Sequence, residues 1–568
     1  MKRCPECGRD YNDDSMSFCL DDGSELLFGP TSAPAIADEP ATAILHEVDH
    51  LNEAVTRTQI HVTGNKSDPP ATSEETSAAK TVDKRLLVIP LALAILVAGA
   101  FVGYRFLRPA AKTPISSIAV LPFENRGGDA DIEYLTDGMA ETLISSLTRL
   151  PDLDVKPRST VFRYKGKEMD PKSIGKELNV QAVLSGSVVQ RGQDISLFVE
   201  LIDTSLDKAI WSETYSRKQT DLVSLQTEIA RDVSGKIKTK LSGTEIAKVS
   251  KYYTSNPEAY QLYLKGNFYR TKYTEDGYKK GIEYYEQAIA LDPNYALPYH
   301  GIAAAYEFAN GWYLPARESM PKARAAALKA LELDETLAET HYLLAKIAFW
   351  YEWVWAATER ESKRANQLDP NFPDYYPVYL AAIGRGDEAI KMQEFVQQRS
   401  PLDLNVNLDS ASLLKDVGRL DESFEQTRRA LELDPNFWWS HQNLGLVYER
   451  KKQYPEAIAA LEKARLMEAN ASNIGYLGYV YGAAGKKAEA LRVLEDLKDL
   501  SGRRYVSPYN FALIYSGLGD RDEAFAWLER AIDERSYEVT LLKVETALEN
   551  LHSDPRFTSL LKRLNLPE

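Results

Sequence analysis

The feature that most constrains this chain is a repeated pattern in its last third. Small, aromatic and aliphatic residues recur with the same internal spacing in three successive stretches: Leu444, Gly445, Tyr448, Ala457, Leu461 and Ala464; Leu477, Gly478, Tyr481, Ala490, Leu494 and Leu497; and Phe511, Ala512, Tyr515, Ala524, Leu528 and Ala531. The step between units is about 34 residues, the length of a helix-turn-helix repeat. Small residues let the two helices of a unit approach closely, and the large ones fill the gap. One unit cannot bury its apolar face alone, so successive units must stack.

This pattern resembles the tetratricopeptide repeat (TPR). The resemblance implies an all-α superhelix of about eight units over 255–535, followed by a helical cap over 536–568. Proline recurs where the second helix of a unit must stop, at Pro293, Pro370, Pro401 and Pro435. The family geometry further implies a curved groove that holds a protein or peptide partner and supplies no catalytic group.

In this family the first helix of each unit lines the groove. The register therefore predicts the partner-binding residues Tyr263, Asn267, Arg270, Tyr342, Lys346, Phe349, Trp439, Gln442, Leu446, Glu449, Tyr479 and Tyr509. Aromatic side chains among mixed polar ones suit a protein surface, although packing between repeats is an alternative role for the same residues. The clamp with which some TPR proteins grip a terminal carboxylate is absent, because only Asn443 fits it.

The N-terminal stretch carries all three cysteines of the chain. Cys4-x-x-Cys7 resembles one knuckle of a zinc ribbon, and Cys19-x-x-Asp22 would be the second, with Asp22 in place of the usual cysteine. Zinc accepts carboxylate oxygen as well as thiolate. Residues 1–27 are therefore predicted to form a small zinc-ribbon-like domain with a structural zinc ion on Cys4, Cys7, Cys19 and Asp22. A knuckle without metal, or with water as the fourth ligand, remains an alternative.

Residues 28–84 are rich in Pro, Ala, Thr, Ser and acidic residues, which predicts a disordered linker. Within it, residues 46–50 match the H-E-x-x-H motif of zinc proteases. The longer protease pattern fails at Glu53 and Thr56, where it requires Gly and His. A short amphipathic helix is therefore the favoured interpretation of this stretch.

The stretch from Leu86 to Tyr104 contains no charged residue and is long enough to cross a bilayer as a helix. We expect one transmembrane helix over 85–107, and Gly99 with Gly103 could pack two such helices into a homodimer. Thiolate ligands suit a reducing cytosol, whereas the cysteine-free remainder suits an extracytoplasmic space. These features predict a single-pass protein of the bacterial inner membrane, with a cytoplasmic N-terminus and extracytoplasmic C-terminal domains.

Residues 114–245 combine short apolar runs with a helical pattern over 134–150, which predicts a mixed α/β domain. The stretches IAVLPFENRGGDADIEYLTDGMAETLISSL, VLSGSVV and IWSETY resemble the TolB-like amino-terminal domain of bacterial membrane proteins, which commonly precedes TPR arrays. Ser185 departs from the pattern, because relatives often carry Glu there. Arg158 and Arg163 could face an anionic partner, and solvated surface arginines are the alternative.

Together these segments predict a multidomain protein: a zinc-ribbon-like N-terminus, one transmembrane helix, an α/β TolB-like domain and an all-α TPR superhelix. The formal net charge of -15 argues against nucleic acid as a partner, because phosphate binding needs clustered Lys and Arg. The sequence shows no phosphate-binding loop, nucleophile elbow or kinase motif. We therefore expect a non-catalytic, membrane-anchored scaffold or adaptor that binds protein partners in its TPR groove. The alternative is a transmembrane sensor that passes partner or ligand binding to a cytosolic protein through the zinc ribbon.

Overall fold

The computed structural model describes residues 2–3, 10–11, 27–28, 115–129, 132–150, 152–167, 170–238, 241–251, 253–369 and 376–566. The chain forms two units, Met1–Leu107 and Arg108–Glu568. In the first unit, β1 (Lys2–Arg3) pairs antiparallel with both β2 (Asp10–Tyr11) and β3 (Leu27–Phe28). Several sequence predictions lie outside the described residues: the zinc ligands Cys4, Cys7, Cys19 and Asp22, the linker motif at 46–50, and the helix pairing through Gly99 and Gly103.

The predicted membrane localisation is corrected by the structure. Within the described ranges, no helix combines the length and the apolar composition that crossing a bilayer requires. The stretch 85–107, on which the prediction depended, lies outside those ranges. A single-pass membrane protein is therefore not supported.

The second unit begins with a mixed α/β domain. Its strands are β4 (Ser117–Val120), β5 (Glu124–Asn125), β6 (Asp154–Val155), β7 (Ala182–Arg191), β8 (Asp194–Asp203) and β9 (Lys208–Lys218). The sheet order is β6-β4-β7-β8-β9, and β5 also pairs with β7. β4 pairs parallel with β6 and β7, whereas β7, β8 and β9 pair antiparallel. Along β8, Ile195, Leu197, Val199 and Leu201 are buried in alternation because successive side chains of a strand point to opposite faces.

The helical elements of this domain are α2 (Glu133–Thr148), α3 (Arg158–Val161), η2 (Phe162–Tyr164), α4 (Pro171–Leu178), η3 (Gln219–Asp221), α5 (Leu222–Ile237) and α6 (Gly243–Val249). Leu135, Met139, Leu143 and Leu147 recur every four residues on α2 and are buried. Their hydrophobic core continues without a break into the first repeat helix, where Leu264 contributes to it. The α/β domain is therefore packed onto the start of the repeat array.

The described residues between Pro257 and Asp533 form eight helix-turn-helix pairs. Pair 1 is α7 (Pro257–Arg270) and α8 (Glu275–Leu291); pair 2 is α9 (Ala296–Ala309) and α10 (Ala316–Leu333); pair 3 is α11 (Ala338–Ile347) and α12 (Trp355–Leu368); pair 4 is α13 (Tyr376–Ala382) and α14 (Gly386–Arg399); pair 5 is α15 (Leu404–Asp416) and α16 (Leu420–Leu433); pair 6 is α17 (Trp438–Arg450) and α18 (Tyr454–Met467); pair 7 is α19 (Ala471–Ala483) and α20 (Lys487–Ser501); pair 8 is α21 (Pro508–Leu518) and α22 (Arg521–Asp533). In pair 3 a π-helical turn, η4 (Ala348–Glu352), follows α11. The predicted all-α superhelix is confirmed.

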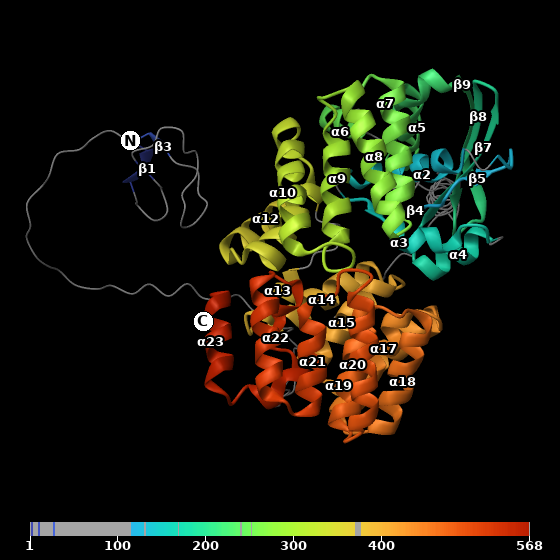
Figure 1. Ribbon diagram of the computed structural model, residues 1–568. Helices are drawn as coiled ribbons and strands as arrows, with labels where there is room; N and C mark the ends of the chain where they lie inside the picture. The colour runs from blue at the N-terminus through green and yellow to red at the C-terminus, as the bar shows by residue number, and fades with distance from the viewer. Residues whose placement is uncertain are drawn as a thin grey trace, which may run out of the picture. The chain divides into compact units, whose positions relative to one another are not determined.

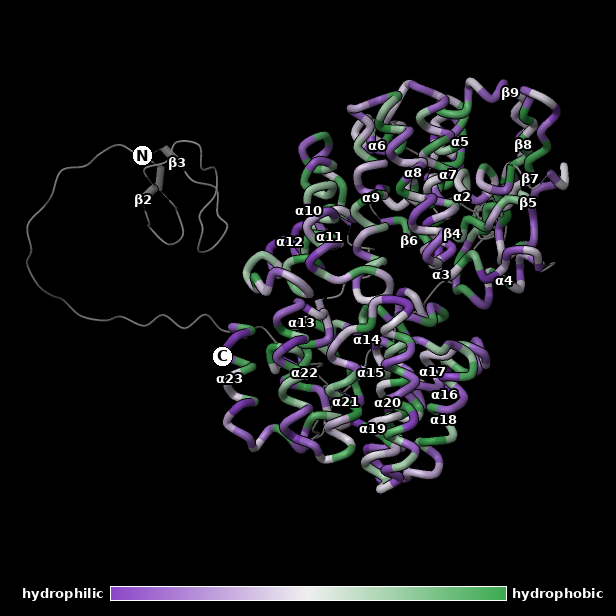
Figure 2. The backbone as a smooth tube through the Cα atoms, in the orientation of Figure 1, coloured by the Kyte–Doolittle hydropathy of each residue, from purple (hydrophilic) through white to green (hydrophobic). Residues whose placement is uncertain are grey.

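A terminal segment follows pair 8, formed by η5 (Tyr537–Leu541), η6 (Thr546–Leu551) and α23 (Pro555–Leu564). It returns to the earlier repeats, because the Trp355 indole Nε1 donates to the carbonyl of Asn565 at 2.6 Å. The Arg535 guanidinium also lies 3.8 Å from the centre of the Trp353 ring. Figure 1 shows the helices of the last pairs, α17 to α22, lying next to those of the earlier pairs. Figure 2 shows hydrophobic and hydrophilic residues alternating along these helices. The repeats of the second unit thus curve until their C-terminal end contacts pair 3.

Close packing in the first pairs centres on Tyr285, which is fully buried between two glycines. A Cβ added at Gly266 or at Gly301 would come within 2.4 Å of the Tyr285 ring. Both helices can therefore approach the ring only because glycine has no side chain.

We predict that Gly266→Ala destabilises the second unit by about 1–3 kcal/mol, because the added methyl overpacks the Tyr285 site. Gly235 provides a matched control: it lies within α5, and an added Cβ there would meet no atom within 4 Å. Gly235→Ala should leave stability unchanged or raise it by up to about 1 kcal/mol, because alanine favours helix. Urea unfolding followed by circular dichroism measures both. Equal effects at the two positions would contradict this packing.

Candidate functional site: the central cleft

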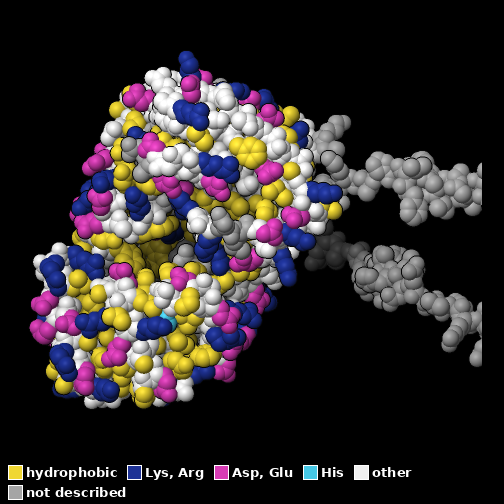
Figure 3. Space-filling model, turned by 90° about the vertical axis from the view of Figure 1, so that its right-hand side faces the viewer, with side chains coloured by type: hydrophobic (Ala, Val, Ile, Leu, Met, Phe, Trp, Pro, Cys, Tyr) yellow, Lys and Arg dark blue, Asp and Glu magenta, His cyan; other side chains and the backbone are white. Residues whose placement is uncertain are grey.

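A large cleft lies inside the curve of the repeats. Its volume is about 2210 Å³, and its walls come from the first helices of successive pairs, from α2 and α3 of the α/β domain, and from the terminal segment. Figure 3 shows the hollow, with hydrophobic side chains gathered inside it and charged ones around it. Small-molecule pockets measure roughly 300–1,000 Å³. The cleft is therefore large enough for a segment of polypeptide.

More than half of the side chains predicted to bind a partner line this cleft. They are Arg270, Tyr342, Lys346, Trp439, Gln442, Leu446 and Tyr509. Tyr263 and Asn267 lie deeper, in a recess off the cleft. The contribution of these residues to partner binding stays a prediction.

Phe349, Glu449 and Tyr479 are buried and do not belong to the cleft lining. Phe349 packs in the core against Trp350, with ring centres 4.4 Å apart. It falls in the π-helical turn η4, where the ordinary helical register no longer applies. Glu449 pairs with Lys452 at 3.3 Å within its own repeat. These three side chains therefore serve packing or local pairing.

Three parts of the cleft wall come from outside the repeat register, and the sequence did not show that they join the cleft. The first is the loop after α9, where Trp312 makes an edge contact with Trp438 of pair 6 at 6.1 Å. The second is the terminal segment, where Glu545 accepts hydrogen bonds from the hydroxyls of Tyr476 (2.8 Å) and Tyr509 (3.0 Å). No periodic signal marks these residues. The aromatic run at 312–313 is the one local hint.

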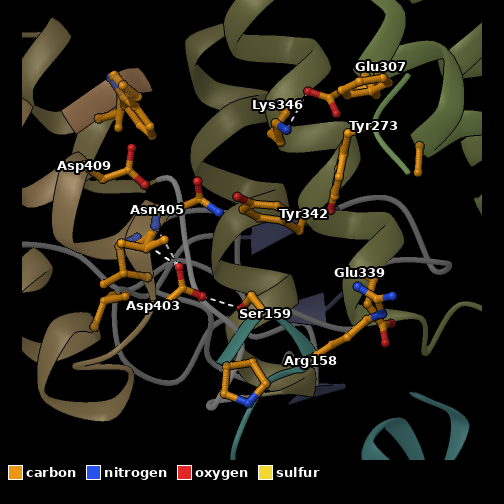
Figure 4. Close-up of a pocket in the computed structure, with 18 of the residues that line it drawn as sticks. Arg158, Ser159, Tyr273, Glu307, Glu339, Tyr342, Lys346, Asp403, Asn405 and Asp409 are labelled. Atoms are coloured by element: carbon orange, nitrogen blue, oxygen red, sulfur yellow. Dashed lines mark hydrogen bonds and ion pairs between the residues drawn. The ribbon is translucent and has the colours of Figure 1, made fainter. Parts of the chain in front are cut away.

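The third part is the α/β domain, whose α3 reaches across to pair 5. The Ser159 hydroxyl donates to Asp403, which also accepts from the backbone amide of Asn405 at 2.9 Å and so caps α15. Lys156 Nζ donates to the carbonyl of Arg399 at 3.1 Å. Figure 4 shows Ser159 and Asp403 meeting below Tyr342, with Asp409 above Asn405 on the Asp403 side. These bonds connect the α/β domain to the end of α14 in pair 4 and to the start of α15 in pair 5.

The two arginines expected to face an anionic partner each form an ion pair with a carboxylate of the same chain. Arg158 Nε lies 3.2 Å from Glu141, and its guanidinium covers the Phe162 ring at 3.9 Å. Arg163 lies 3.7 Å from Glu177. Both arginines line the cleft, but their charges are already partly balanced.

Two carboxyls of the cleft titrate near neutrality. Burial, with the nearby Asp403 carboxylate, raises the pKa of Asp409 to about 7. Burial also raises the pKa of Glu538 to about 7, although the Ser507 hydroxyl donates to it at 3.2 Å. Perturbed pKa values are frequent at functional sites. The charge of the cleft therefore changes between mildly acidic and mildly basic pH.

Among the residues that the structure describes, no group of three or more His, Cys, Asp or Glu side chains is placed to hold a metal ion. The arrangement of the cleft suits binding: half-buried aromatic rings, such as those of Trp438 and Trp439, lie among charged and amide groups.

Comparison with known proteins agrees with the repeat architecture. Residues 274–295, 427–459 and 509–536 match tetratricopeptide repeat families, so the chain carries TPR repeats. Residues 114–232 match the family described as "HilA/YgeH-like transcriptional regulator, second domain". That match covers most of the α/β domain; the TolB-like identity expected from the sequence is not shown by it.

One curated relative is named "Putative adenylate cyclase 3", from Rhizobium meliloti (strain 1021). It is 29% identical over 236 residues, which are 41% of this chain and 40% of that protein. The match thus spans less than half of the relative's length.

Two solved TPR structures are also similar. The first is described as "YrrB: a TPR protein with an unusual peptide-binding site"; it is 20% identical, with 33% of this chain and 92% of that chain covered and a TM-score of 0.24. The second is a thermophilic TPR protein from Thermus thermophilus; it is 22% identical, with 33% of this chain and 96% of that chain covered and a TM-score of 0.25.

We predict that Asp409→Asn stabilises the protein at about pH 8 by on the order of 1 kcal/mol and has a smaller effect at about pH 5. The folded chain keeps Asp409 protonated up to about pH 7, whereas an unfolded Asp ionises near about pH 4. The folded state thus binds the extra proton, and the free energy of unfolding falls as pH rises through this window.

Asparagine removes that dependence because it cannot ionise. The exposed Asp499 provides the control, since Asp499→Asn should change stability by less than about 0.5 kcal/mol at either pH. Thermal unfolding of both variants across this pH range tests the assignment. A pH-independent effect of Asp409→Asn would show that its carboxyl is not buried as described.

Proposed function

We propose that the protein is a scaffold that holds an extended segment of a partner protein in the central cleft. The observation that carries this proposal is the size and lining of the cleft: about 2210 Å³, walled by the first helices of TPR pairs. This volume exceeds that of a small-molecule pocket. A polypeptide in a groove of repeats buries a long surface, which is how repeat proteins use their concave faces.

The lining has the composition of a protein-binding surface. Trp312, Trp438 and Trp439 offer large rings, with Tyr342 further along the cleft. Tyr and Trp commonly carry most of the binding energy of an interface because they bury much area with little loss of side-chain entropy. Carboxyls such as Asp409, Asp434 and Glu545 lie among these rings. A partner segment with basic and apolar side chains would complement both.

The alternative proposal is a sensor that passes binding in the cleft to a separate protein. Two observations favour it. The α/β domain shares a core with pair 1 and contacts pair 5 through Ser159, so occupancy of the cleft would act directly on this domain. The match of the same domain to a transcriptional regulator family, and the name of the cyclase relative, also point to signalling roles.

Under either proposal the chain itself is not an enzyme. The cyclase relative makes this testable, because that protein's name implies formation of cyclic AMP from ATP. Turnover of ATP to cyclic AMP by the purified chain would contradict the proposal.

Photo-crosslinking tests the scaffold function. A photoreactive phenylalanine analogue replaces either Trp439, inside the cleft, or Leu466, which is 87% exposed and lies outside the cleft lining. Peptides selected from a random library for binding to the native protein should crosslink at position 439 and not at 466. Trp439→Ala should weaken their binding by at least about tenfold, because loss of an anchoring aromatic costs on the order of 2 kcal/mol.

Leu466→Ala is the matched control and should leave affinity unchanged. Circular dichroism verifies that both variants are folded. Peptides that crosslink at 466, or that bind Trp439→Ala as tightly as the native protein, would refute the cleft as the binding site.

We further propose that Cys4, Cys7, Cys19 and Asp22 bind a structural zinc ion, as their spacing suggests. Protein purified under reducing conditions should contain about one zinc ion per chain by elemental analysis. Cys4→Ser should lower the zinc content, because thiolates dominate the affinity of such sites, whereas Ser17→Ala should not. Native protein without zinc would eliminate this proposal.

A further inference from the structure

A second, smaller cavity opens beside the cleft at the junction of the α/β domain and the first repeats. This recess has a volume of about 440 Å³ and is lined from α2, α7, α9 and α11, together with the segment before α7. Its volume falls within the roughly 300–1,000 Å³ of small-molecule sites. Arg270, Tyr342 and Lys346 line both the recess and the cleft.

Arg270 is the central charged group of the recess. Its Nε donates to the Tyr285 hydroxyl at 3.2 Å, and that hydroxyl donates to Asn267 at 2.6 Å. These bonds hold the guanidinium in one orientation. Among the described residues, no carboxylate forms an ion pair with Arg270, and its two terminal nitrogens make no hydrogen bond. A guanidinium has five N–H donors, so most of them remain open toward the two cavities.

The other charges of the recess are largely balanced in pairs. Glu141 of α2 pairs with Arg158 at 3.2 Å, Glu307 of α9 with Lys346 of α11 at 2.5 Å, and Lys251 with Asp334 at 2.7 Å. The charged residues of the recess that form no ion pair are then two cations, Arg149 and Arg270, and one carboxylate, Glu339.

Arg149, which directly follows α2, also lines the recess. It donates to the Tyr253 hydroxyl at 2.8 Å and to the carbonyl of Lys248 at 3.4 Å, both of which are neutral acceptors. The recess therefore keeps a surplus of positive charge.

The remaining lining combines neutral hydrogen-bonding groups with aliphatic side chains such as Leu297 and Leu343. Tyr263 and Tyr295 turn their rings toward each other at 5.3 Å, and Tyr260 donates to Gln226 at 2.5 Å. Burial lowers the pKa of His300 to about 4, so its ring is neutral. Its Nδ1 shares a hydrogen bond with Thr340 at 3.0 Å. Such groups suit the polar body of a small molecule.

We propose that this recess binds a small organic molecule through an oxyanion, a carboxylate or a phosphate, held by Arg270 with Arg149. Glu141 attracts the Arg270 guanidinium and contributes to its raised pKa, but forms no ion pair with it. A partly buried guanidinium that lacks an ion-paired anion is costly unless a bound anion accompanies it. The planar fork of arginine fits the two oxygens of either oxyanion. Because Arg270, Tyr342 and Lys346 also form the cleft wall, a bound ligand would change the surface presented to a polypeptide in the cleft.

Binding of simple anions to the whole protein tests this site. Thermal unfolding is followed while sodium phosphate or sodium acetate replaces sodium chloride at constant ionic strength. We expect one of the two anions to raise Tm in a saturable way. Stabilisation by phosphate alone identifies a phosphate-bearing ligand, and stabilisation by acetate alone identifies a carboxylate.

Substitutions then locate the site. Arg270→Gln and Arg149→Gln should each weaken the apparent affinity for the stabilising anion by at least about tenfold, because each removes a charge-assisted donor pair. Arg428→Gln is the matched control: Arg428 is half-exposed on α16, pairs with Glu425 and Glu432, and should leave the response unchanged. Within the described part of the chain, Arg149 makes hydrogen bonds only to the two neutral acceptors named above, so its variant serves if Arg270→Gln does not fold.

No saturable response to either anion would overturn the proposal, as would an equal response in the arginine variants and in Arg428→Gln. The anion assay uses no peptide, so a negative result would not contradict the proposed scaffold function of the cleft. Likewise, a negative result in the peptide-crosslinking experiment would not contradict anion binding in the recess.

Discussion

The structure depends on a constraint common to stacked helix pairs: each pair buries only the faces that its neighbours cover, so both ends of the array need a cover. At the first end, the α/β domain supplies it. Gly138 of α2 allows this approach, since a Cβ there would lie 2.8 Å from Leu264 of α7. At the other end, the terminal segment covers pair 8 and also reaches back to pair 3. The uncovered apolar surface is thereby reduced at both ends.

This closure creates the cleft. An open superhelix would present its concave face to solvent along one side, whereas here the loop after α9, helix α3 and the terminal segment add walls that repeats alone do not provide. The contacts that close it are mixed in kind. Trp350 and Tyr537 meet edge to face at 5.6 Å, and Arg317 donates to the carbonyl of Asp533 at 2.6 Å. Aromatic packing with fixed polar bonds gives a defined interior, which is what recognition of a partner segment needs.

The cleft and its recess differ in electrostatics although they share a wall. Half-buried carboxyls such as Asp409 and Glu538 give the cleft a charge that depends on pH, whereas arginines give the recess a permanent positive surplus. The wall between them is held by the Glu307–Lys346 pair and by the bond between Arg270 and Tyr285. A proposed ligand on one side would therefore act on the other through a few fixed side chains.

The sequence by itself determined the helix pairs, because the repeat spacing is a local property: small and large residues such as Gly445 and Leu461 meet within one unit. It also placed Trp439 and Tyr342 correctly on first helices. It could not show that the Phe349 side chain packs in the core instead of lining the groove, since a π-helical turn interrupts the register there. Only the tertiary structure decided the closure of the array, the cleft walls that Ser159 of the α/β domain and Glu545 of the terminal segment add, and the recess around Arg270. These features join residues far apart in the chain, whose contact depends on the accumulated curvature of the whole array and leaves no periodic trace in the sequence.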